Sequence, residues 1–154
     1  MNTAEDILKD KNREMLWVSS DQTIQEVIEL MVKNRIGAIL VKKGGDIVGI
    51  WTERDLLRNL VSPGFDPRRA PIGEYMSSPL HSAPHDASLE SLEEMFLGLF
   101  IRHLLIEKEG SYIGLLSIGD VLRANLLEKD RKIKELNSLA SWQYYENWGW
   151  KRKK

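Results

Sequence analysis

The sequence predicts a mixed α/β fold of the α+β kind. It consists of two β-α-β-β-α repeats packed with pseudo-twofold symmetry, followed by a C-terminal helix. The main observation is an internal repeat: from residue 21 to residue 122, similar side chains recur at a constant offset of 65 positions without a gap. Gly49 and Asp55, for example, correspond to Gly114 and Asp120. Both copies also show the same order of extended and helical apolar patterns. Because each unit alone buries little apolar surface, we expect the two to pack together and to form two equivalent clefts.

Each element of the first unit follows from a local pattern. Apolar residues recur every three or four positions from Ile24 to Met31, which predicts a helix. Thr23 and Glu26 have the spacing of a capping box at its start. The glycines within 42–46 indicate a turn between two strands. The predicted elements are an extended stretch at 16–18, a helix from 24, strands at 38–41 and 47–51, and a helix that opens at Thr52 and ends near 62–64.

The second unit repeats this order after a connecting segment. Three of the five prolines fall between residues 63 and 76, which is typical of a linker, here with one helical turn. The predicted elements that follow are an extended stretch at 80–83, a helix from Ser88, strands at 103–106 and 112–116, and a helix from Ser117. The predicted boundaries are 1–64 for repeat 1, 65–76 for the linker, 77–128 for repeat 2, and 129–154 for a C-terminal helical extension with an aromatic and basic tail.

The composition excludes several classes of function. The chain has 154 residues, a net charge of −1 and no cysteine. A nearly neutral charge gives no field that would attract nucleic acid. The lack of cysteine excludes disulfides, thiolate metal sites and cysteine nucleophiles. The N-terminus carries no apolar signal segment, and no apolar run reaches the ~18 residues needed to span a bilayer. These features predict a cytoplasmic protein.

The repeated motif Thr/Ser-x-x-Asp has two interpretations that are compatible with each other. A hydroxyl residue followed three positions later by an acid is the signature of a helix cap. The same geometry suits a ribose phosphate, because a helix N-terminus attracts anions and a carboxylate accepts hydrogen bonds from two neighbouring hydroxyls. The spacing from Thr52 to Asp55, and from Ser117 to Asp120, does not choose between capping and binding.

Two stretches carry a resemblance to a known family. They are IGAILVKKGGDIVGIWTERDLL in the first unit and IRHLLIEKEGSYIGLLSIGDVL in the second, where MSSPLHSAPHDASLESL opens the unit. With these motifs the chain resembles, over about residues 7–128, a tandem pair of CBS domains, the arrangement called a Bateman module. The SIGDV form followed by a long polar helix is most similar to stand-alone bacterial CBS proteins related to inosine-monophosphate dehydrogenase.

The resemblance implies a regulatory module that senses adenine nucleotides, with AMP first and ATP, ADP, NAD(H) or S-adenosylmethionine as alternatives. It implies that Asp55 and Asp120 hold ribose and that Thr52 and Ser117 approach phosphate. It also places adenine against Ile50 or Leu115 and against the opening strand of the other unit. Those opening positions are Pro79, Leu80 and His81 for the Thr52 cleft, and Glu14, Met15 and Leu16 for the Ser117 cleft. A flat homodimer is the usual assembly.

The two clefts are expected to differ. In the family, a basic pair at the start of the middle strand often faces the signature of the other unit. The second unit has this pair, Arg102-His103, where the first has Gly37-Ala38. The Thr52 cleft is therefore expected to gain Arg102, His103 and Arg54 and to bind phosphate more strongly. The alternative for this pair is a solvated strand end with a satisfied histidine.

Other features bear on metal binding, catalysis and interaction with partners. His81 and His85 are four positions apart, but Pro84 lies between them, so we predict no metal site. No paired nucleophile and base is visible, so we predict that the chain is not an enzyme; turnover of a nucleotide would contradict this. The crowded aromatics of 142–150 before four basic residues indicate packing on the module or dimer, or a docking tail for a protein or an anionic membrane. A nucleotide-independent interaction scaffold acting through that tail is the alternative function.

Overall fold

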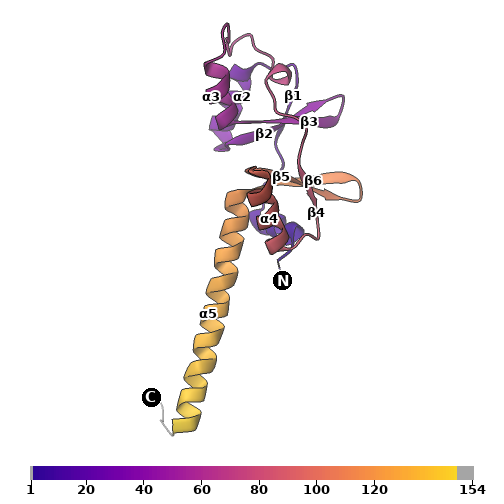
Figure 1. The fold of residues 1–154 in the computed structure, drawn as a ribbon. Helices are drawn as coiled ribbons and strands as arrows, with labels where there is room; N and C mark the ends of the chain where they lie inside the picture. Colours follow the sequence, from indigo (N-terminus) through magenta and orange to yellow (C-terminus); the bar gives the residue numbers. More distant parts are fainter. Residues whose placement is uncertain (1, 149–154) are drawn as a thin grey trace.

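The computed structural model describes residues 2–148 of the chain, and the side chains of residues 2–139. It has two three-stranded sheets, each in a unit of its own, and a long C-terminal helix (Figure 1). The first unit contains β1 (Trp17–Ser19), α2 (Ile24–Asn34), β2 (Ala38–Lys43), β3 (Asp46–Thr52) and α3 (Glu53–Leu60). The second contains β4 (Ser82–Pro84), α4 (Leu89–Leu99), β5 (His103–Lys108), β6 (Ser111–Ser117) and α5 (Ile118–Trp148). Helix α1 (Ala4–Lys11) precedes the first unit, and the short helix η1 (Ile72–Glu74) precedes the second.

The two sheets have the same topology, which confirms the predicted fold class. In each, the first strand runs parallel to the second and the second pairs antiparallel with the third. The middle strands begin with buried runs, as expected for strands covered on both faces. At the start of α2, Thr23 Oγ1 accepts a hydrogen bond from the Glu26 N–H at 3.3 Å. This is one half of the capping box predicted there; in the described residues the Glu26 carboxylate does not return the second bond.

The segments before the two units cross over to the opposite cores. Ala4 and Ile7 of α1 are buried in the core of the second unit. Ala70 and Ile72, next to and within η1, are buried in the core of the first. Each crossing segment covers a glycine of the sheet that it meets. A Cβ atom added at Gly114 would lie 2.6 Å from Leu8 Cδ2, and one at Gly49 would collide with the Met76 side chain. The N-terminal segment is therefore part of the second unit in space, although it precedes the first in sequence.

Helix α5 extends well beyond the second unit (Figure 1). Its first turns contact α4, α1 and β6. The far part of α5 that is described does not pack back on the module, since Ile133 and Leu136 are 56% and 64% exposed. The side chains of residues 140–148 and all of residues 149–154 lie outside the described part, and with them the predicted aromatic and basic tail. Among the described residues, no helix is both long and apolar enough to cross a bilayer.

Candidate ligand cavity between the two units

Both Thr/Ser-x-x-Asp motifs form reciprocal caps at the start of a helix. Thr52 N–H donates to Asp55 Oδ2 at 3.0 Å, and Asp55 N–H donates to Thr52 Oγ1 at 3.3 Å. Ser117 and Asp120 exchange the same two bonds at 2.8 and 3.1 Å. The capping interpretation is thus confirmed for both. It leaves binding open, because a carboxylate has a second oxygen and further lone pairs available.

The Thr52 side is closed by the chain itself. Ser77 N–H donates to the Ile50 carbonyl at 2.7 Å, and Ile50 N–H donates back to the Ser77 carbonyl at 3.1 Å. The main-chain edge of Ile50, where adenine was expected, is therefore already paired. Asp55 is only 7% exposed, and its Oδ1 accepts from Ser77 Oγ at 3.3 Å and lies 3.7 Å from the Arg58 guanidinium. This carboxylate already has its partners within the chain.

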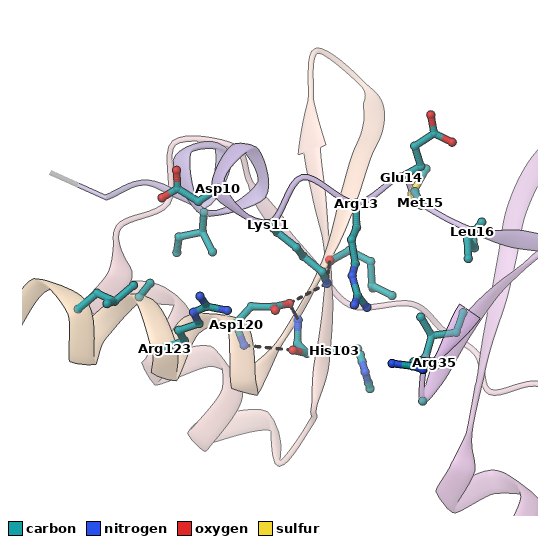
Figure 2. A pocket seen from close by; sticks show the side chains of 18 residues that line it. Asp10, Lys11, Arg13, Glu14, Met15, Leu16, Arg35, His103, Asp120 and Arg123 are labelled. Atoms are coloured by element: carbon teal, nitrogen blue, oxygen red, sulfur yellow. Dashed lines mark hydrogen bonds and ion pairs between the residues drawn. The ribbon is translucent and has the colours of Figure 1, made fainter. Parts of the chain in front are cut away.

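The Ser117 side is open and holds a cavity of about 570 Å³, within the usual range for ligand pockets. Residues from both units and from the N-terminal segment line it, which puts it between the units (Figure 2). Lys11 reaches across its floor: the ammonium Nζ lies 2.8 Å from Asp120 Oδ2 and 3.1 Å from the Leu115 carbonyl oxygen. A second cavity, of about 410 Å³, lies near Ser82 and His85, and neither of these two cavities includes Thr52 or Asp55.

The difference between the two sides follows from the crossing segments. Helix α1 ends at Lys11, and Asn12 takes the left-handed conformation (φ 47°) that closes a helix C-terminus. The chain then turns away from β6, so the carbonyl of Leu115 meets the Lys11 side chain. After η1 the chain instead continues alongside β3 and makes the Ser77–Ile50 bridge. A full helix with a left-handed cap before one unit, and a single helical turn before the other, makes one cleft open and the other closed.

Two titratable groups in the cavity are perturbed. Burial lowers the pKa of His103 from its ordinary value, and the positive charges of Lys11 and Arg102 lower it further, against an opposing effect of Asp120. His103 is therefore mostly neutral at pH 7. For Asp120, burial raises the pKa, but the hydrogen bonds from Lys11 and Ser117 outweigh it and the net shift is downward. The cavity thus holds a carboxylate that stays ionised and a histidine that can both donate and accept.

The cavity brings together some of the residues predicted from the sequence and omits others. Those that line it are Glu14, Met15, Leu16, His103, Leu115, Ser117 and Asp120. Those that do not are Ile50, Thr52, Arg54, Asp55, Pro79, Leu80, His81 and Arg102.

The expectation that His103 belongs to the Thr52 cleft was wrong, because His103 lines the Ser117 cavity. His103 pairs directly with Ser117 across the β5–β6 register, and cross-strand partners share a face of the sheet. The cavity also contains cationic residues that the sequence analysis did not single out: Lys11, Arg13, Arg35 and Arg123. One signal for them was available, since Arg35 lies two positions before Gly37-Ala38, where the missing basic pair was sought.

No cluster of three metal-ligating side chains occurs within the described residues. His85 is engaged elsewhere, since its Nδ1 lies 3.0 Å from Glu5 Oε2.

Comparisons with known proteins agree with the repeat and the fold. The family model for the CBS domain matches twice, at residues 4–62 and 72–126. The CBS domain-containing protein YhcV of Bacillus subtilis is 35% identical over 104 residues, covering 68% of this chain and 74% of YhcV. The crystal structure of a CBS-domain protein from Agrobacterium tumefaciens superposes with a TM-score of 0.75 at 30% identity, covering 80% of this chain and 99% of that one. A CBS domain protein from Pyrobaculum aerophilum, solved in complex with AMP, has a TM-score of 0.70 at 26% identity, covering 82% and 97%.

Proposed function

Because this chain belongs to the CBS-domain family, we propose that it is a regulatory module that binds an adenine nucleotide in the cavity at Ser117 and Asp120. The observation that carries the proposal is the cavity itself. It joins both units, and a hydroxyl, an ionised carboxylate and several cations line it at the N-terminus of α5. The AMP complex of the Pyrobaculum aerophilum protein supports a nucleotide as the ligand class.

The lining residues suit the parts of a nucleotide. Leu16 and Leu115 offer apolar surface to a base from two different units. Asp120 can accept hydrogen bonds from the two ribose hydroxyls once Lys11 releases it, as acids do in dinucleotide sites. The Ser117 hydroxyl and the first N–H groups of α5 favour phosphate, because a helix N-terminus carries a partial positive charge. The predicted nucleotide site thus moves to the Ser117 side, and binding at Thr52 stays a prediction.

Ligand binding at this place is expected to change how the units pack. A molecule that contacts both units binds one relative arrangement better than others and so shifts the population toward it. Lys11 links the cavity to α1, whose Ile7 is buried in the core of the second unit. Occupancy can therefore change the last turn of α1, a helix that contacts α5. This output is regulatory rather than catalytic, so turnover of ATP or NAD, abolished by a cavity variant, would contradict it.

The test is calorimetric titration of the purified protein with AMP, ATP, NADH and S-adenosylmethionine. Asp120→Ala should weaken binding by at least about 10-fold, since hydrogen bonds to a charged group contribute about 1.5–3 kcal/mol. Asp55→Ala is the matched control, because it removes the equivalent cap on the closed side, and it should leave the affinity of the Ser117 cavity within about 2-fold. No binding by nucleotide-free wild-type protein would refute the proposal and favour the interaction scaffold.

We further propose that the protein is a homodimer that uses the exposed stripe of α5. The exposed apolar residues of α5 follow a heptad repeat and therefore lie on one face of the helix. The a positions are Leu126 and Ile133, and the d positions are Leu122, Lys129 and Leu136. Isoleucine at an a position with leucine at d favours two parallel strands. Ion pairs four residues apart, such as Arg131–Glu135 at 2.7 Å, stabilise the polar face of the helix.

We also propose a cytoplasmic location, since a cysteine-free chain suits a reducing compartment.

A further inference from the structure

We propose that the cavity selects nucleotides that carry more than one phosphate, and that Arg13 and Arg35 are the residues that distinguish them from a monophosphate. The inference rests on the proposed function and deepens it, because it names the class of ligand. It departs from the expectation of AMP that the sequence resemblance gave. The observations that carry it are the positions of the two arginines, the lack of ion-pair partners for them within residues 2–139, and the bond between Lys11 and Asp120.

Arg13 and Arg35 reach the cavity from outside the second unit. Arg13 lies in the segment between α1 and β1, and Arg35 is the residue that caps the end of α2. Figure 2 shows both side chains pointing into the cavity, on the side of the Lys11–Asp120 pair that faces the first unit. Arg35 has a left-handed backbone (φ 54°), which non-glycine residues rarely adopt, and it sits where the chain turns from α2 toward β2. The two guanidinium groups therefore lie beyond the ribose and phosphate positions at Asp120 and Ser117.

These guanidinium groups are available to a ligand. Within residues 2–139, neither Arg13 nor Arg35 has an ion-pair partner. Two other carboxylates line the cavity, those of Asp10 and Glu14, and both point away from the Lys11–Asp120 pair (Figure 2). Arginine is the side chain best matched to phosphate, because its planar fork donates two parallel charge-assisted hydrogen bonds.

Lys11 makes the site more favourable for a highly charged ligand. A ribose hydroxyl that binds Asp120 Oδ2 competes with the ammonium of Lys11, which lies 2.8 Å from that oxygen. The two side chains are about three-quarters buried, so the displaced ammonium loses a partner in a poorly solvated place. A chain of phosphates offers it a new one. A neutral nucleoside has no anionic group for the Lys11 ammonium. The phosphate of a monophosphate is already bound by Ser117 and the N-terminus of α5, so it gives Lys11 little.

The closed side of the molecule lacks this set of cations. Arg35 corresponds by the 65-residue offset to Phe100, and residues 70–80, the segment before the second unit, contain no lysine or arginine to match Lys11 and Arg13. The selectivity is therefore assigned to one cavity, and it comes from the chain before the first unit and the end of α2, outside both Thr/Ser-x-x-Asp motifs.

The experiment compares AMP, ADP and ATP by calorimetry, without added magnesium, on the wild type and on the double variant Arg13→Gln/Arg35→Gln. The wild type should bind ATP at least about 10-fold more tightly than AMP, as expected for a few charge-assisted hydrogen bonds. The double variant should lose most of that ratio while its AMP affinity changes by about 2-fold or less. Arg68→Gln, in the exposed linker, is the matched control for lost charge and should keep the ratio. Circular dichroism verifies that each variant is folded.

The outcomes separate this inference from the function on which it rests. Equal affinities for AMP and ATP in the wild type, or an unchanged ratio in the double variant, would overturn the selectivity alone. A double variant that loses AMP and ATP binding equally would also overturn it, since the arginines would then serve the nucleotide as a whole. If no nucleotide binds the wild type, the proposed function fails and this inference with it.

Discussion

The crossing of α1 onto the second unit can be tested at one glycine. Gly114 has no positive φ, so its backbone accommodates alanine without strain. The added Cβ would lie 2.6 and 2.8 Å from the two terminal carbons of Leu8, where 3.4–4 Å is ordinary contact. Leu8 must therefore move by about 1 Å. Overpacking costs typically about 1–3 kcal/mol. Because the atoms that must move are the ends of a flexible side chain, we expect Gly114→Ala to lower the free energy of unfolding by about 1–2 kcal/mol.

The assay is urea unfolding followed by circular dichroism, with two companion variants. Gly98→Ala is the control. Gly98 lies in α4, and among the described residues no atom outside its chain neighbours and its own helix backbone lies within 4 Å of its added Cβ. Because alanine favours a helix, stability should rise by up to about 1 kcal/mol. Leu8→Ala removes the side chain that a Cβ at position 114 would meet. The double variant Gly114→Ala/Leu8→Ala should therefore lose about 1 kcal/mol less stability than the sum of the losses in the two single variants. Additivity within about 0.3–0.5 kcal/mol would show that Leu8 does not cover Gly114, and would refute the placement of α1.

Two further predictions concern the dimer and the anchoring of α1. The chain has no cysteine, so Lys129→Cys, at a d position of the proposed parallel coiled coil, should form a disulfide-linked dimer under mild oxidation, while Arg131→Cys on the opposite face should not; equal cross-linking of both would contradict the register. Hydrogen bonds from Lys108 and then His85 lower the pKa of Glu5 from 4.5 to about 2. A depressed folded pKa gives stability that is complete above pH 4.5 and is lost as pH falls toward 2. Wild type should therefore lose more stability than Glu5→Gln across that interval, and parallel curves of urea midpoint against pH would exclude this role.

The sequence predicted the elements that the two units share, but not the difference between the segments that precede them. The two sheets, their helices and the caps at Thr52 and Ser117 follow from local pattern, because strand alternation, helical spacing and capping residues act over a few positions. The 65-residue offset then fixed which positions correspond. The segments before the two units carry no such pattern. Whether Lys11 or Met76 meets the sheet depends on how far α1 and η1 extend, which long-range packing decides.

The misplacement of His103 shows the same limit in detail. The family pattern assigned the Arg102-His103 pair to the cleft of the other unit's motif, whereas His103 lines the cavity of the Ser117 motif in its own unit. Its register with Ser117 settles which cavity it lines, and register comes from pairing across strands rather than from a motif. Arg13 and Arg35 were missed because they lie in a connecting segment and at a helix end, where side-chain direction follows from the backbone path.

Lys11 connects the asymmetry of the clefts with regulation. In the closed cleft, Asp55 contacts Arg58 of its own helix and Ser77 of the segment before β4, so a ligand would have to break these contacts. In the open cleft, the Asp120 carboxylate accepts one bond from the Ser117 N–H of its own cap and one from a distant part of the chain, the ammonium of Lys11 at the end of α1. A ligand that binds the Asp120 carboxylate in place of Lys11 frees the end of α1, while Ala4 and Ile7 stay buried in the core. The effect on α1 is thus confined to its last turn, next to the arginines of the following segment. An open site with one displaceable internal partner is the arrangement in which binding energy can be converted into a local structural change.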